Sequence, residues 1–266
     1  MLEAKTMPAL FIGHGSPMNA IEDNEFSRAW RETATRFPRP AAVLCISAHW
    51  ETAGVRVNDQ AHPRTIHDFY GFPDELFAVR YPAPGSAELT AGVVGLLDAL
   101  PAAPDRSWGI DHGAWSVLRR MYPDADVPVV QLSLDSSRPG SFHYRTGQLL
   151  RPLRDQGVLI LGSGNIVHNL GLYDFRDDTP YPWAESFDAR IGELIAARRH
   201  GEIADYRNLG DDADLAIPTP EHYLPLLHVL GAAADEEPEF FCRKILGSLS
   251  MTSVAFGMGT GSGPKL

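Results

Sequence analysis

The sequence predicts an α/β fold in which a mostly parallel central sheet is flanked by helices. Two observations lead to this prediction. Short, nearly continuous apolar runs are typical of strands buried on both faces. Amphipathic stretches with capping signals alternate with these runs along the 266-residue chain. No repeat or long linker interrupts the alternation, so a single domain spanning residues 1–266 is expected.

The predicted strands are rich in β-branched residues and end at Gly, Ser or His. The clearest runs are residues 8–12, 41–47, 127–134 and 157–161. Weaker strand patterns occur at residues 77–81 and near either 240–246 or 253–258.

The predicted helices carry apolar residues at helical spacing and begin near capping residues. They cover residues 86–97, 112–121, 141–154, 183–199 and 219–230. In the last of these, Thr219 is the expected N-cap, Pro220 lies in the first turn and Gly231 follows the end.

The composition is normal for a globular protein. The formal net charge of −11 argues against nucleic acid or an anionic membrane as a partner, because both require basic patches. No run approaches the roughly 20 apolar residues of a membrane span. The two cysteines, Cys45 and Cys242, lie in apolar surroundings, and Glu3 and Lys5 precede any apolar stretch. A reducing cytoplasm and no secretory signal are therefore expected, and the oligomeric state stays open.

Three histidines follow the ends of predicted strands. His14 comes after the first strand, His49 after the second and His168 shortly after residues 157–161. In an open α/β sheet, ligands gather outside the carboxyl ends of the strands, so these imidazoles are expected to converge.

Two more histidines stand at turns that lead into predicted helices, His222 at residues 218–223 and His112 at residues 108–113. Imidazole is the commonest side-chain ligand for metals and suits both iron and zinc. The set His14, His49, His168 and His222 therefore predicts a metal site. The glycines near these histidines fit neither a dinucleotide nor a P-loop motif, and no GxSxG elbow indicates a serine hydrolase.

Seven short stretches, in order and spread over residues 13–222, resemble one family. The chain is similar to the class III extradiol ring-cleavage dioxygenases of the LigB superfamily, and within it to the 4,5-DOPA extradiol dioxygenase group. The stretches are GHGSP at 13–17, SAHW at 47–50, HDFYGFP at 67–73, YPAPG at 81–85, WGIDHG at 108–113, GSGN with HN at 162–169, and TPEH at 219–222.

The resemblance implies a single LigB-like catalytic domain that cleaves a catechol with O₂ at a non-haem metal held by His14 and His49. The third ligand is either His222, which the DOPA-type pattern favours, or Glu221. His168 matches the catalytic base of the superfamily and is also a candidate ligand. Fe(II) is the expected metal, although Zn²⁺ readily occupies nitrogen-rich sites.

Further roles are expected nearby. His112, beside Asp111, is a candidate proton donor, and Ser16 and Asn165 are candidates for orienting ligands. Two other functions remain open: a zinc-dependent hydrolase using the same histidines, and a LigB-like protein that binds metal without turnover.

A long aromatic loop at residues 62–81 is expected to cover the pocket. Tyr70 or Phe72 could stack on a substrate ring, and His67 is a candidate contact for a substrate carboxylate.

Overall fold

The apolar runs form the centre of an eight-stranded sheet in the computed structural model, which describes residues 6–100 and 102–258. The sheet order is β4-β3-β5-β2-β6-β1-β10-β7, and β8 and β9 form a separate hairpin. The strands are β1 (Ala9–Gly13), β2 (Ala42–Glu51), β3 (Arg56–Asn58), β4 (Ala103–Asp105), β5 (Val129–Leu134), β6 (Val158–Gly164), β7 (Pro238–Phe241), β8 (Ile245–Leu246), β9 (Leu249–Ser250) and β10 (Ser253–Phe256).

The middle of the sheet is parallel, as predicted. Strands β5, β2, β6 and β1 run in one direction. Toward one edge β10 pairs antiparallel with β1 and β7 pairs antiparallel with β10, and toward the other edge β3 pairs antiparallel with β5. The predicted domain, 1–266, includes the positions 1–5, 101 and 259–266, which lie outside the described residues.

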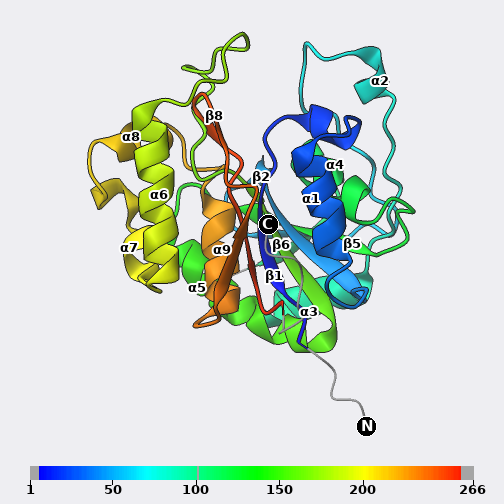
Figure 1. The fold of residues 1–266 in the computed structure, drawn as a ribbon. Helices are drawn as coiled ribbons and strands as arrows, with labels where there is room; N and C mark the ends of the chain where they lie inside the picture. Colours follow the sequence, from blue (N-terminus) through cyan, green and yellow to red (C-terminus); the bar gives the residue numbers. More distant parts are fainter. Residues whose placement is uncertain (1–5, 101, 259–266) are drawn as a thin grey trace.

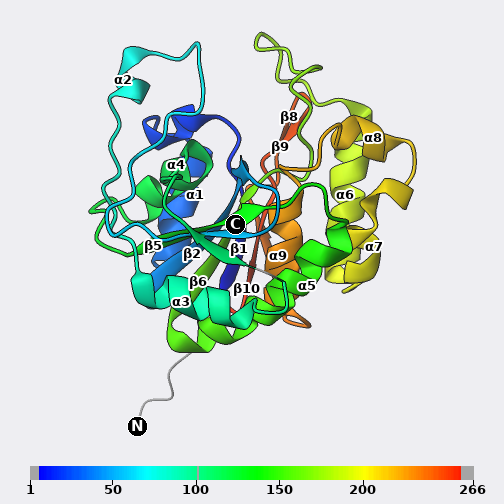
Figure 2. The same cartoon turned by 180° about the vertical axis from the view of Figure 1, so that it is seen from behind.

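Helices cover both faces of the sheet (Figures 1 and 2). Helices α1 and α4 lie on one face, and α5, α6 and α9 lie on the other. Their bounds are α1 (Glu25–Ala34), α2 (Asp74–Phe77), α3 (Ala87–Leu96), α4 (His112–Met121), α5 (Gly140–Leu150), α6 (Pro182–Ala196), α7 (His200–Ala204), α8 (Asp212–Ala216) and α9 (Leu224–Ala233), with 3₁₀ turns η1 (Pro17–Ala20), η2 (Arg151–Gln156) and η3 (Tyr206–Asn208).

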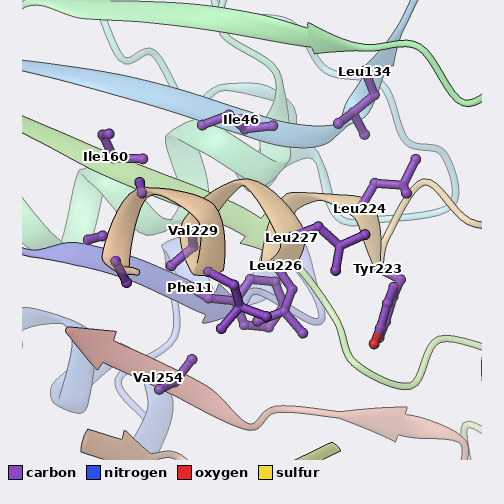
Figure 3. Packing of buried hydrophobic residues seen from close by; sticks show 14 of the residues in the cluster. Phe11, Ile46, Leu134, Ile160, Tyr223, Leu224, Leu226, Leu227, Val229 and Val254 are labelled. Carbon is purple, nitrogen blue, oxygen red and sulfur yellow. The ribbon is translucent and has the colours of Figure 1, made fainter. Parts of the chain in front are cut away.

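Successive residues of a central strand point to opposite faces of the sheet, and both faces are buried, so these strands are apolar throughout. In β2, Leu44 and Ile46 face the cluster that contains α9, whereas Val43 and Cys45 face the cluster that contains α1 and α4. Figure 3 shows the first of these interfaces, where side chains of α9 such as Val229 pack over the sheet. Burial on both faces holds the central strands, and with them their carboxyl ends, in fixed positions.

Two sequence predictions are wrong in detail. Residues 77–81 form no strand, and the four-residue helix α2 ends at Phe77. Tyr81 is buried, and its hydroxyl group lies within hydrogen-bond distance of the carbonyls of Tyr122 and Leu118. The last predicted helix begins at Leu224, because Pro220 closes a turn and Pro225 is the proline in the first helical turn. Both alternative C-terminal strand regions form strands, β7 and β10, which pair with each other.

None of the described helices is long and apolar enough to span a bilayer.

The buried guanidinium of Arg154 links the segment before β1 to the end of α9. Arg154 has no exposed surface; it donates to the carbonyls of Met7 and Ala232 and pairs with Glu236 at 2.7 Å. R154A is expected to lower the free energy of unfolding by about 3–5 kcal/mol, since it opens a cavity and leaves several acceptors unpaired. Denaturant unfolding measures this, and R28A, which breaks an exposed pair with Asp23, should change stability by less than about 1 kcal/mol. Equal effects of the two variants would contradict the structural role of Arg154.

Candidate metal centre

Five imidazoles meet at the carboxyl ends of the parallel strands. The loop after β1 contributes His14, the end of β2 contributes His49 and the segment after β6 contributes His168. His112 is the first residue of α4, and His222 lies in the turn before α9. The predicted convergence of distant histidines at this edge is therefore present in the structure.

His49 reaches the cluster differently from the prediction. Strand β2 does not end before it but continues to Glu51, and its pairing with β5 shifts register between Ile46 and Glu51. Such an irregularity bends a strand and redirects its side chains. The shift occurs next to the site, and His49 lies inside it.

The ring separations define the cluster. The ring centroid of His14 lies 5.1 Å from that of His49 and 5.4 Å from that of His222, and the centroids of His49 and His112 are 3.9 Å apart. His168 stacks on His222 with 3.4 Å between centroids and 7° between planes. Two groups have ligand atoms within 4.8 Å of one another: one is His14, His49 and His112, and the other is His168, Glu221 and His222.

The hydrogen bonds of His14 determine which ring nitrogen carries its proton. The Ser163 hydroxyl donates its single proton to the carbonyl of Gly113 at 2.6 Å. Its oxygen, 3.1 Å from Nδ1 of His14, must therefore accept from that nitrogen. Nε2 of His14 is left with a free lone pair that faces the cluster.

A carboxylate gives His49 the same tautomer. Nδ1 of His49 lies 3.2 Å from Oδ2 of Asp68. An ionised carboxylate only accepts, so the proton of His49 belongs on Nδ1 and its Nε2 carries a lone pair. Burial raises the pKa of Asp68, but the neighbouring His112 and His49 outweigh it and lower the pKa to about 2, which keeps the carboxylate ionised.

The two bare nitrogens face each other. Nε2 of His14 and Nε2 of His49 are 3.2 Å apart. Burial, with a smaller contribution from neighbouring imidazoles, lowers the pKa values of His14 and His49 well below 6.5. Each ring is therefore neutral at pH 7, with one proton on Nδ1 and none on Nε2. Two lone pairs at this distance repel unless a cation lies between them, and the pair therefore has the chemistry of a metal-binding site.

His222 is oriented by its sequence neighbour. Its Nδ1 lies 3.0 Å from Oε1 of Glu221, which also accepts from Thr219, so Nε2 of His222 is the nitrogen free to face the cluster. The backbone N–H of Asn165 donates to the carbonyl of His222 and fixes the turn. Burial, followed by the charge of His168, lowers the pKa of His222 well below its usual value.

His168 lies at the edge of the cluster and is more exposed than His14 or His222. Its backbone N–H donates to the carbonyl of Ala216, and burial, followed by the effect of His112, lowers its pKa to about 4. The ring is therefore neutral at pH 7 and can accept a proton.

A buried carboxylate holds the start of α4 and hence His112. Asp111 caps the helix and accepts from Ser47 at 2.6 Å, from Gln131 at 2.7 Å and from Trp108 at 3.1 Å. Burial, and secondarily the charge of Asp68, raises its pKa despite these donors. The network links α4 to β2 and β5, so the position of His112 is set by both strands.

Asp68 is a residue of the site that sequence reasoning missed. It lies in the 62–81 loop, where one oxygen approaches His49 and the other lies 3.0 Å from Nδ1 of His112. Its position inside the motif HDFYGFP was the only available signal.

The structure also places the other residues that the sequence singled out. Ser16 caps η1 by accepting the backbone N–H of Met18 at 3.2 Å. His67 packs among aromatic rings with Nε2 3.0 Å from the carbonyl of Val79. Tyr70 is 92% exposed, and Phe69, rather than Phe72, contacts His112 edge-on at 5.4 Å. The loop therefore packs onto the cluster through Phe69.

Gly113 provides a test of how tightly the site is packed. A Cβ at this position would lie 2.5 Å from Oγ of Ser47 and 2.7 Å from Cδ2 of His49. G113A is therefore expected to displace His49 and weaken metal binding by about 10–100-fold, as measured by competition with a chelator. G95A, a helical glycine whose added Cβ meets nothing within 4 Å, is the matched control and should bind normally. Unchanged affinity in G113A would show that His49 does not hold the ion.

Comparison with known proteins identifies the family of the chain. Residues 8–259 match the family described as the catalytic LigB subunit of aromatic ring-opening dioxygenases. A 4,5-DOPA dioxygenase extradiol of Escherichia coli K12 is 47% identical over 263 residues, covering 97% of each chain. The protein of the same name from Beta vulgaris is 42% identical over 85% of this chain and 86% of its own length. A crystal structure of an uncharacterised Escherichia coli K12 protein superposes with a TM-score of 0.81 at 42% identity, covering 94% of this chain and 99% of that one.

Proposed function

The chain belongs to the LigB family of aromatic ring-opening dioxygenases, and from this premise we propose that it cleaves catechols with Fe(II) held by His14, His49 and His222. It is an extradiol ring-cleaving dioxygenase whose substrates are a small aromatic molecule and O₂. The proposal adds the metal, its ligands and the roles of the remaining histidines. The observation that carries it is the 3.2 Å separation between Nε2 of His14 and Nε2 of His49.

The donor set fits a metal ion. Two nitrogens bound to one ion at about 2.0–2.1 Å, with angles between right and tetrahedral, lie roughly 2.8–3.4 Å apart. The separation between His14 and His49 falls in this range. Both outer nitrogens have acceptors, Ser163 and Asp68, which is the usual arrangement behind metal-bound imidazoles.

His222 is the proposed third ligand. Its Nε2 is free, and its ring lies 5.4 Å from His14 and 5.1 Å from His49. Glu221 instead contacts Nδ1 of His222, which suits a supporting role. By ligand-atom distances within 4.8 Å, His112 groups with His14 and His49, whereas His222 groups with His168 and Glu221, so the choice between His222 and His112 needs a test. H222Q should lose metal affinity, whereas H112Q should keep the metal and lose turnover; the opposite pattern would exchange the two assignments.

Fe(II) is proposed because O₂ chemistry requires a redox-active metal, whereas Zn²⁺ has no redox chemistry. The three imidazoles are neutral ligands and also suit zinc, which binds nitrogen sites more tightly than ferrous iron. Zinc in the purified protein would therefore not indicate a hydrolase.

The protein side of the mechanism follows from the protonation states. Bound Fe(II) supplies Lewis acidity toward the diol and redox chemistry toward O₂. His168, neutral at pH 7, can take a hydroxyl proton from the catechol. His112, with Nδ1 beside Asp68, can deliver a proton to the site. Phe69 packs against His112 and limits the access of water there.

The substrate proposed is a catechol with a DOPA-like side chain, which follows from the names of the relatives. One catalytic domain over residues 1–266 is proposed from the match to residues 8–259. The free thiols Cys45 and Cys242 support a reducing, cytoplasmic setting. The net charge of −11 supports small-molecule partners rather than nucleic acid or an anionic membrane surface.

Oxygen uptake tests the function. Protein loaded anaerobically with Fe(II), mixed with L-DOPA or catechol and then given O₂, should consume one O₂ for each ring opened and form a yellow semialdehyde. The Zn²⁺-loaded protein is the matched control and should consume none. Absence of oxygen uptake with every catechol tried, at full iron occupancy, would refute the proposed reaction.

A further inference from the structure

We propose that Asp68 is a positioning residue that sets the tautomer of His49 and the orientation of His112 at the same time. The inference rests on the proposed function, since it assigns His49 to the metal and His112 to proton delivery. The carboxylate oxygens of Asp68 lie at Nδ1 of His49 and at Nδ1 of His112, and not at Nε2 of either ring. It would therefore act through the two histidines and not on the substrate.

One carboxylate meets both demands because it has two acceptor oxygens and no donor. Oδ2 lies 3.2 Å from Nδ1 of His49. Oδ1 lies 3.0 Å from Nδ1 of His112 and also accepts the backbone N–H of His112 at 3.0 Å. Asp68 thus offers an acceptor oxygen to three nitrogens: Nδ1 of His49, Nδ1 of His112 and the backbone N–H of His112.

The contact of Asp68 with the His112 ring is close but poorly aligned. Nδ1 of His112 is buried and has no partner that meets hydrogen-bond geometry among the described residues. The backbone N–H of His112 is the better aligned donor to the same oxygen. Asp68 therefore holds the start of α4 through the backbone N–H of His112 and lies against the Nδ1 side of both rings.

The loop brings Asp68 to the cluster through its neighbours on both sides. The carbonyl of Ile66 accepts from the indole N–H of Trp115 at 2.7 Å. Phe69 packs on His112 and, at 6.1 Å, on Trp115. The Asp68 side chain is only 19% exposed, although Tyr70 two residues later is 92% exposed. The loop is thus anchored on α4 where it carries the carboxylate.

An amide in place of the carboxylate, as in D68N, cannot satisfy both sides. If the amide oxygen accepted from the backbone N–H of His112, the NH₂ group would face Nδ1 of His49. His49 would then have to move its proton to Nε2, the nitrogen proposed to bind the metal. If the amide flipped, its NH₂ group would oppose the N–H of His112. Either arrangement weakens one of the two proposed functions.

The test compares D68N with D74N, which makes the same change at an exposed carboxylate of the same loop. Zn²⁺ affinity is measured by chelator competition, without turnover. D68N should bind Zn²⁺ about 10–100-fold more weakly than wild type, and D74N should match wild type. D68E, which restores two acceptors, should recover part of the loss. Ring ¹⁵N chemical shifts of metal-free protein should place the His49 proton on Nδ1 in wild type and shift toward Nε2–H in D68N.

Equal Zn²⁺ affinity and an unchanged His49 tautomer in folded D68N would overturn the inference. A fall in melting temperature with neither of these changes would also overturn it, because it would show a structural role alone. The proposed metal site is tested separately by comparing wild type with H14A. If those two proteins bound Zn²⁺ equally, the site assignment would fail whatever D68N does.

Discussion

Replacing His14 with alanine is expected to remove tight metal binding and, with it, all measurable ring cleavage. His14 contributes one of the two facing Nε2 atoms, and the residue is only 1% exposed. A site reduced to two imidazoles loses the ligand count that holds an ion at an open coordination site.

Metal content after dialysis and oxygen uptake measure the effect of H14A. The matched control is H62A, since His62 is an exposed histidine outside the cluster. Wild type and H62A should retain roughly one ion per chain, and H14A should retain almost none. Normal metal content in H14A would refute the ligand assignment, even if activity were lost.

Replacing His168 with glutamine is expected to lower kcat by about 10²–10⁴-fold, which is the usual contribution of a general base. His168 stacks on His222 face to face, so glutamine removes the proton acceptor without disturbing the nitrogens of His14 and His49. The Fe(II) content should stay close to that of wild type. Single-turnover oxygen uptake by iron-loaded protein measures the chemical step.

H168Q also decides between the two roles left open by the sequence. If His168 were a ligand, the variant would lose metal affinity together with activity. If it were neither ligand nor base, kcat would be unchanged. H143Q is a suitable control, because His143 is buried and donates only to the carbonyl of Asp135, away from the cluster.

The central fold could be predicted because its signal is local. Strands β2, β5 and β6 are buried on both faces, and continuous apolar runs report that directly. The short strands β3 and β4 carry no such signal, since each has three residues and lies toward an edge of the sheet. Residues 77–81 contain Phe77, Val79 and Tyr81, residue types that favour strands, but tertiary hydrogen bonds decide their conformation.

The site was predictable to the extent that topology brings strand ends together. His14, His49 and His168 follow from that rule, and His222 from its turn. Asp68 does not, because its role depends on a loop folding back onto a helix 44 positions later in the chain. The start of α9 was misplaced for a related reason: two prolines offered the same signal, and the turn at Pro220 is closed by contacts that the sequence pattern does not reveal.

The central claim is that Nε2 of His14 and Nε2 of His49 share one metal ion. A crystal structure of the anaerobic Fe(II)-loaded protein, with the ion located by anomalous scattering at the iron edge, tests it most directly. One iron is expected within about 2.0–2.3 Å of both nitrogens, with Ser163 and Asp68 still at the outer nitrogens. An iron bound through Nδ1, or bound away from these two histidines, would contradict the claim.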